Sequence, residues 1–140
     1  MQIRDGNLLD ATEDVIIQQC NCITQRGYGL SASITDRFPY ADVYSKRPLD
    51  YKETPGEVIL CGDGGINRYV ACLMGQFYPG KGNQFYDTYE MRRQWIHDSL
   101  WKLGYHMLKT KLKTIAAPYL MGCSLAGDNW EQHEAIFKGL

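Results

Sequence analysis

The sequence predicts an α/β fold, a three-layer α/β/α sandwich with a mixed, mostly parallel sheet. Three observations predict it. Segments of strand character alternate along the chain with segments of helical periodicity, which is typical of α/β layers. The β-branched run Val15-Ile16-Ile17 is typical of a strand buried on both faces. The chain has 140 residues, of which 44% are hydrophobic and 22% charged, as in one ordinary globular domain spanning residues 1–140.

In the first half of the chain, strands are expected at residues 1–4 and 14–20, with a Gly-Asn turn signal between them. A Gly-Tyr-Gly segment precedes a helix expected at 30–38. Pro39 ends that helix, because proline disfavours helical geometry in the residue before it. A short helix is expected at 41–45, inside a stretch bounded by prolines.

In the second half, strands at 57–61 and 69–74 are joined by a Gly-Asp-Gly-Gly hairpin signal. The longest helix is expected at 86–109, followed by a strand at 114–119 and a last helix at 129–137. The apolar positions of the long helix recur at a helical spacing: Tyr89, Ile96, Leu100, Leu103 and Met107.

Composition excludes several classes of function. The net charge is −1, so no strong nucleic-acid binding is expected. No run of about 20 apolar residues could cross a membrane, and the N-terminus lacks the pattern of a signal peptide. Five cysteines without an export signal indicate reduced thiols and a cytoplasmic protein. Cys20 and Cys22 have no further ligands at zinc-site spacing, so no metal is expected. No cofactor is expected either.

Two loops rich in small residues are candidates for an anion site. In parallel sheets, ligands bind where strands lead into helices. Residues 21–30 follow a buried strand and open a helix, whose free N–H groups attract anions. Residues 118–130 also leave a strand and enter a helix, and their consecutive amides suit a diphosphate. A plain glycine turn and a connecting loop with a helix cap remain alternative interpretations of these two segments.

Four segments in order resemble the macrodomain family, and in particular its small phage and bacterial members. They are residues 6–11, residues 18–22 with 27–30, residues 75–76 with 86–90, and Pro118 with 122–130. The resemblance implies ADP-ribose as the ligand, free or on an ADP-ribosylated substrate. It also implies relatedness to ADP-ribosyl glycohydrolases and ADP-ribose-1''-phosphate phosphatases.

The resemblance also implies a set of ligand-binding residues. Asn7 takes the position of an adenine-recognising Asp, Leu8 offers its backbone beside it, and Asn21 matches an asparagine near the distal ribose. The two small-residue loops would surround the ribose and the diphosphate. The implied binding residues are Asn7, Leu8, Asn21, Gly27, Tyr28, Gly29, Leu30, Gln76, Pro118, Gly122, Cys123, Ser124, Leu125, Ala126 and Gly127.

Certain positions depart from the family pattern. Gln76 and Ala126 stand near the lysine and aspartate positions of the glycohydrolases, and Ser124 replaces a loop glycine. The family closes its sheet with a strand after the last helix, so we expect a shortened fold or another element in that place.

The predicted function is hydrolysis of a bond at the distal ribose. Asn21 would orient the ribose or a water molecule, and Asp128 would act as the general base, unless Asp128 only caps the following helix. The alternative is a non-catalytic module that binds ADP-ribose or another adenine nucleotide. The sequence does not indicate an oligomeric state.

Overall fold

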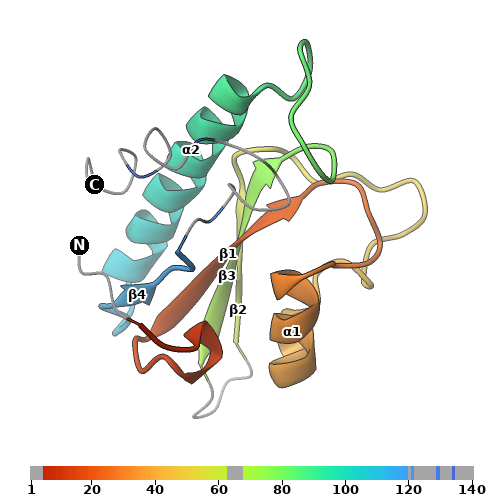
Figure 1. Ribbon diagram of the computed structural model, residues 1–140. Coiled ribbons are helices and arrows are strands. Elements are labelled where there is room, and N and C mark those ends of the chain that lie inside the picture. Colours follow the sequence, from red (N-terminus) through yellow and green to blue (C-terminus); the bar gives the residue numbers. More distant parts are fainter. Residues whose placement is uncertain (1–4, 63–67, 120, 122–128, 130–133, 135–140) are drawn as a thin grey trace.

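A mixed four-stranded sheet forms the centre of the fold (Figure 1). The computed structural model describes residues 5–62, 68–119, 121, 129 and 134. The strands are β1 (Val15–Asn21), β2 (Val58–Cys61), β3 (Tyr69–Gln76) and β4 (Ile115–Ala116), in the order β2-β3-β1-β4. β1 runs parallel to β3 and β4, whereas β2 is antiparallel to β3. The predicted mixed, mostly parallel sheet is therefore confirmed.

The two central strands are buried on both faces. The side chains of Val15, Ile16 and Ile17 are fully buried, as are those from Val70 to Met74. Such continuous apolar runs are expected where helices cover both sides of a sheet. Because these strands are held from both faces, their carboxyl ends are fixed in position.

In the described part of the chain, one α-helix covers each face of the sheet (Figure 1). α1 (Leu30–Arg37) lies on one face, and α2 (Tyr89–Leu108) packs its buried residues against the other. Two short 3-10 helices, η1 (Leu8–Asp10) and η2 (Pro39–Ala41), lie on the side of α1. Each face has its own apolar cluster, which confirms the three-layer arrangement.

The long helix begins three residues later than the sequence predicted. Thr88 caps α2, and its hydroxyl accepts a hydrogen bond from the amide of Met91 at 3.1 Å. Residues 85–87 instead form a turn, because the side-chain oxygen of Asn83 accepts hydrogen bonds from all three of their amides. An asparagine that binds nearby backbone in this way competes with helix formation.

Two other elements differ from their predictions. The expected helix at 41–45 is wrong: η2 ends at Ala41, and the carboxylate of Asp42 then holds Ser45 in a turn. The strand expected at 114–119 is only the two residues of β4, which pair with Val15 and Ile16. The predicted strand at 1–4 lies outside the described residues, as do nearly all of the helix at 129–137 and the closing end of the sheet. Within the described part of the chain, no helix has the length and apolarity needed to cross a membrane.

Candidate functional site

The carboxyl ends of β1 and β3 meet at one edge of the sheet. Asn21 pairs with Gln76 across the two strands, after a shift in register that follows Gln19. Beyond the strands, the amide of Cys22 donates to the carbonyl of Phe77 at 3.1 Å. The segment after β1 and the segment after β3 therefore lie side by side, which is the arrangement that the strand-end rule predicts for a ligand site.

Asn21 organises the loop that follows β1. Its side-chain oxygen accepts hydrogen bonds from the amides of Ile23 (3.1 Å) and Thr24 (2.9 Å) and from the Thr24 hydroxyl (3.0 Å). The side-chain nitrogen donates to none of the described residues. Asn21 is only 7% exposed. A ligand or a water could therefore use its nitrogen as a donor, while its oxygen is already occupied by the loop.

The first predicted glycine segment leads directly into α1. Gly29 is the N-cap residue, with φ +58°, a conformation that favours glycine. Gly27 serves packing, because a Cβ there would lie 2.8 Å from the Cβ of Ser31 and 3.2 Å from the Tyr44 ring. Tyr28 and Leu30 are exposed, at 60% and 39%. The loop thus offers backbone and exposed side chains to a ligand, but Gly27 is explained without one.

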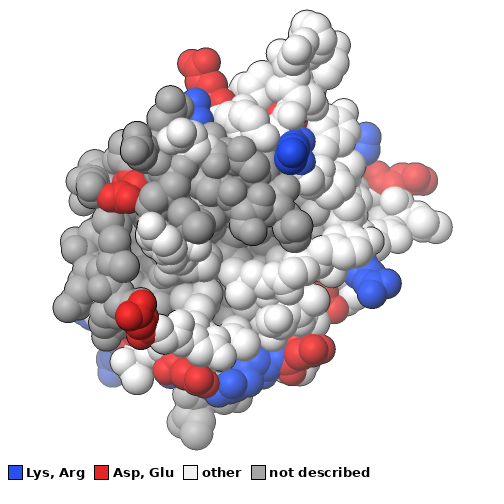
Figure 2. Space-filling model, in the orientation of Figure 1, with Lys and Arg blue, Asp and Glu red and all other residues white. Residues whose placement is uncertain are grey.

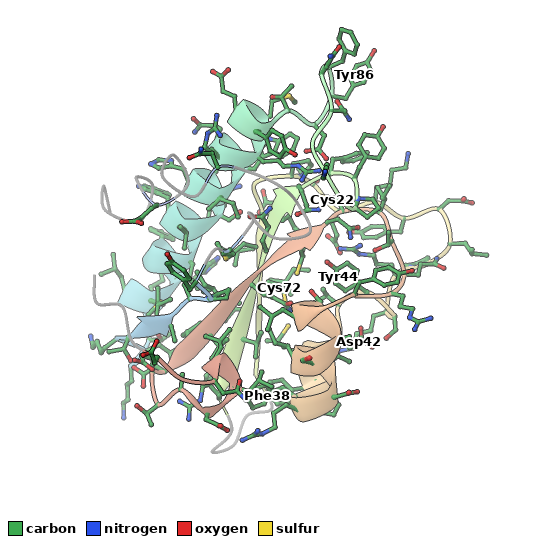
Figure 3. All side chains as sticks on the ribbon, viewed as in Figure 1. Cys22, Phe38, Asp42, Tyr44, Cys72 and Tyr86 are labelled. Carbon is green, nitrogen blue, oxygen red and sulfur yellow. The ribbon has the colours of Figure 1, made fainter. Side chains whose placement is uncertain are left out.

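A buried arginine behind this loop is the main feature that the sequence did not reveal. Arg47 donates to the carbonyls of Asn21 (2.6 Å) and Thr24 (2.7 Å), and its guanidinium lies 4.7 Å from the centre of the Tyr44 ring. The Tyr44 hydroxyl in turn accepts from the amide of Asn21 at 3.0 Å. Figure 3 shows Tyr44 on the α1 side of the sheet. Arg47 lies in a proline-bounded stretch without periodicity, so no sequence signal pointed to it.

Gln76 belongs to a chain of amide hydrogen bonds. Its oxygen accepts from the side chain of Gln19 and its nitrogen donates to the carbonyl of Tyr78, both at 2.9 Å. Because the Tyr78 carbonyl can only accept, the Gln76 nitrogen must face it, and the Gln76 oxygen then faces the Gln19 nitrogen. The side-chain oxygen of Gln19 is buried and has no hydrogen-bond partner within the described part of the chain. Buried acceptors without partners are rare, which makes Gln19 a second candidate that the sequence missed.

The segment after β3 forms an arm, residues 77–88, that carries two exposed rings at its tip. At its base the carboxylate of Asp87 binds Arg92 through two 2.7 Å contacts and accepts from the Tyr78 amide at 2.8 Å. Both charged side chains are at most 1% exposed. At the tip, Phe85 and Tyr86 are 76% and 74% exposed, and Figure 3 shows Tyr86 far from the sheet.

The remaining predicted residues lie elsewhere. Asn7 caps η1 by accepting from the amide of Leu9, and Leu8 packs against the α1-side cluster. A contact between Asp10 and Arg37 places η1 beside the last residue of α1. Asn7 and Leu8 therefore lie near the C-terminal end of α1, whereas Gly29 caps its N-terminal end. Pro118 is half-buried after β4. Gly122 to Gly127 and Asp128 lie outside the described residues.

The electrostatics of the site come from buried groups. Burial raises the pKa of the Cys22 thiol to about 12, although the nearby Arg47 charge acts to lower that pKa. On the described part of the face in Figure 2, blue and red residues are interspersed and form no continuous basic patch. Among the described residues, no group of His, Cys, Asp and Glu side chains could hold a metal ion.

The fold is similar to that of solved macrodomains. It matches the DarG macrodomain of Mycobacterium tuberculosis with a TM-score of 0.73 and 17% identity, covering 97% of this chain and 86% of that one. It matches the Thermus aquaticus DarG macrodomain with a TM-score of 0.70 and 20% identity, covering 96% of this chain and 85% of that one. It also matches Thermosipho africanus DarTG in complex with ADP-ribose, with a TM-score of 0.66 and 16% identity, covering 94% of this chain and 35% of that one. No family model and no curated protein matches the sequence. This likeness establishes the macrodomain fold that the sequence motifs predicted.

Proposed function

We propose that this chain, which has the macrodomain fold, binds ADP-ribose at the carboxyl ends of β1 and β3 and hydrolyses a bond at its distal ribose. The observation that carries the proposal is the match over 94% of the chain to a protein solved with ADP-ribose. The site geometry supports it, because a loop whose residues 25, 26, 28 and 29 are exposed joins β1 to the N-terminus of α1. Helix N-termini and loop amides suit phosphate groups.

In this proposal, residues 21–30 surround the distal ribose and the phosphates. Asn21 donates from its side-chain nitrogen to a ribose hydroxyl or to a water. The buried Gln19 oxygen, which has no partner among the described residues, accepts from a second hydroxyl or water. The loop at 122–127 holds the diphosphate, and Asp128 serves as the base in the hydrolytic step.

The binding step is tested by calorimetry with ADP-ribose on the wild type and on Asn21→Asp. Aspartate keeps the acceptor oxygen that holds Ile23 and Thr24 but removes the donor, so we expect the fold to persist and the affinity to fall by about tenfold. Asn83→Asp is the matched control, because Asn83 accepts from three amides in the same way at the tip of the arm. Equal affinity of all three proteins would contradict this role of Asn21. No binding by the wild type would contradict the proposal itself.

A non-catalytic binding module is the second candidate function. The observation that favours it is that Asn21 and Gln76 are amides, which do not take up protons at neutral pH, and that most of their hydrogen-bonding groups are already engaged. Incubating the protein with ADP-ribosylated protein and with ADP-ribose-1''-phosphate separates the two functions. Release of ADP-ribose from either substrate supports hydrolysis, and tight binding without product supports the module.

A further inference from the structure

Arg47 places a positive charge directly behind the loop after β1. Its side chain is 1% exposed, and two of its nitrogens donate to the carbonyls of Asn21 and Thr24. It therefore contributes nothing to the surface charge visible in Figure 2. A buried charge is screened by salt much less than an exposed one, so its field reaches through the loop.

This buried charge is only partly neutralised. The nearest carboxylate is that of Glu53, whose oxygen lies 4.0 Å from the Arg47 Nε. That Nε is buried and has no hydrogen-bond partner among the residues that the structure describes. The charge of Asp87 also raises the pKa of Cys22, but both oxygens of the Asp87 carboxylate are bound to Arg92. The guanidinium is therefore in direct contact with the loop carbonyls, whereas its nearest counter-charge lies 4.0 Å away on the Nε side.

The peptide group between Thr24 and Gln25 transmits this charge outwards. Its carbonyl accepts from Arg47 at 2.7 Å. In a trans peptide the N–H points away from the C=O, and no described peptide bond is cis. The amide of Gln25 therefore points away from Arg47, and it donates to none of the described residues. Hydrogen bonding at the carbonyl polarises the peptide and strengthens this donor.

We propose that Arg47 is a specificity-determining residue that makes the loop at 21–30 select a phosphate-bearing ligand, acting through the peptide between Thr24 and Gln25. It is a positioning residue, since it acts through backbone and touches no ligand itself. The inference rests on the proposed function, because this loop would hold the ADP-ribose phosphates. It accounts for anion binding by a chain of net charge −1.

Three variants separate the charge of Arg47 from its shape. Arg47→Met keeps the buried stem without the charge, and we expect ADP-ribose affinity to fall by about tenfold or more. Arg47→Lys keeps the charge, so its affinity should stay within about threefold of the wild type. Glu53→Gln removes the partial neutralisation and should tighten binding by about threefold. Glu57→Gln is the control, since it removes the same charge from an exposed residue paired with Lys102.

Adenosine, followed by NMR titration, is the neutral probe. Its affinity should be the same in the wild type and in Glu53→Gln, because it has no phosphate. The inference is overturned if Arg47→Lys weakens ADP-ribose as much as Arg47→Met does, since the cause would then be loop shape. It is also overturned if Glu53→Gln leaves ADP-ribose affinity unchanged or tightens adenosine equally. The Glu53 variant keeps the test valid even where Arg47→Met does not fold.

Inorganic pyrophosphate distinguishes failure of this inference from failure of the proposed function. If the wild type binds pyrophosphate but not ADP-ribose, and Glu53→Gln tightens the pyrophosphate complex, the inference stands and the proposed function is refuted. If neither anion binds more tightly to Glu53→Gln than to the wild type, the inference is refuted.

Discussion

Replacing Asp87 by alanine should destabilise the protein through the arginine that it leaves behind. The Asp87 carboxylate accepts two contacts from Arg92 at 2.7 Å and one from the Tyr78 amide at 2.8 Å. Both charged side chains are at most 1% exposed. Removing one partner of such a buried pair costs about 3–5 kcal/mol, because the remaining charge is buried without compensation.

The structure places the expected value near the lower end of that range. Arg92 also donates to the carbonyls of Gly80 (2.8 Å) and Tyr78 (3.3 Å), and these contacts remain in the variant. We therefore expect the free energy of unfolding to fall by about 3 kcal/mol. For a domain whose total stability is about 5–15 kcal/mol, this is a large fraction.

Urea unfolding, followed by tryptophan fluorescence, measures this loss. The control is the double variant Asp87→Ala with Arg92→Met, which removes the uncompensated charge but keeps an apolar stem. It should be more stable than Asp87→Ala alone, because apolar replacement of a whole buried pair is often neutral or stabilising. A loss below about 1 kcal/mol for Asp87→Ala would refute the reasoning, since that is the level of an exposed ion pair. A double variant as unstable as the sum of the two single variants would refute it as well.

Three further results are expected. Gly75→Ala should lower the free energy of unfolding by about 1–3 kcal/mol, because its Cβ would lie 2.2 Å from the buried Ile96 Cδ1; Gly104→Ala, in open space within α2, should raise it by up to about 1 kcal/mol. Backbone hydrogen bonds, first that from the amide of residue 113, lower the pKa of Asp14 below 3.8. The stability that this carboxylate contributes is present above pH 3.8 and is lost as the pH falls through the lowered pKa. Asp14→Asn should remove this contribution from urea midpoints measured from about pH 6 to about pH 2. Because the pKa of Cys22 is raised to about 12, iodoacetamide at pH 8 followed by peptide mapping should label it far more slowly in native than in unfolded protein; equal rates would contradict its burial.

The sheet and its two helices were predictable because they rest on patterns of burial. The apolar runs of β1 and β3 indicate strands buried on both sides, and the helical spacing of apolar residues in α2 predicts the face that packs on the sheet. The ends of elements were less predictable, since single side chains decide them. Asn83 delays the start of α2 by holding three amides, and Asp42 replaces a predicted helix with a turn. An asparagine or aspartate in the sequence is compatible with a helix cap, a turn or a ligand contact, and only its neighbours in space decide among them.

The same ambiguity explains which parts of the candidate site the sequence could predict. Asn21 stands at the end of a buried strand, which is visible in the sequence. That its oxygen is used by Ile23 and Thr24 is a three-dimensional fact. Arg47 has no local signal, because its contacts with Asn21 and Thr24 span more than twenty residues and depend on how the chain returns behind the loop.

Anion selection in this fold is consequently hard to infer from surface composition. A net charge of −1 and the interspersed charges of the described residues on the face in Figure 2 argue against a basic binding face there. Yet an exposed arginine would be hydrated and screened, whereas a buried one that binds backbone carbonyls acts through oriented peptide dipoles in a medium of lower dielectric constant. In the proposed role, its position behind the loop leaves the ligand side to backbone amides, which suit phosphate groups. A single hidden charge of this kind can therefore give the loop a preference for phosphate that the count of surface lysines and arginines does not reveal.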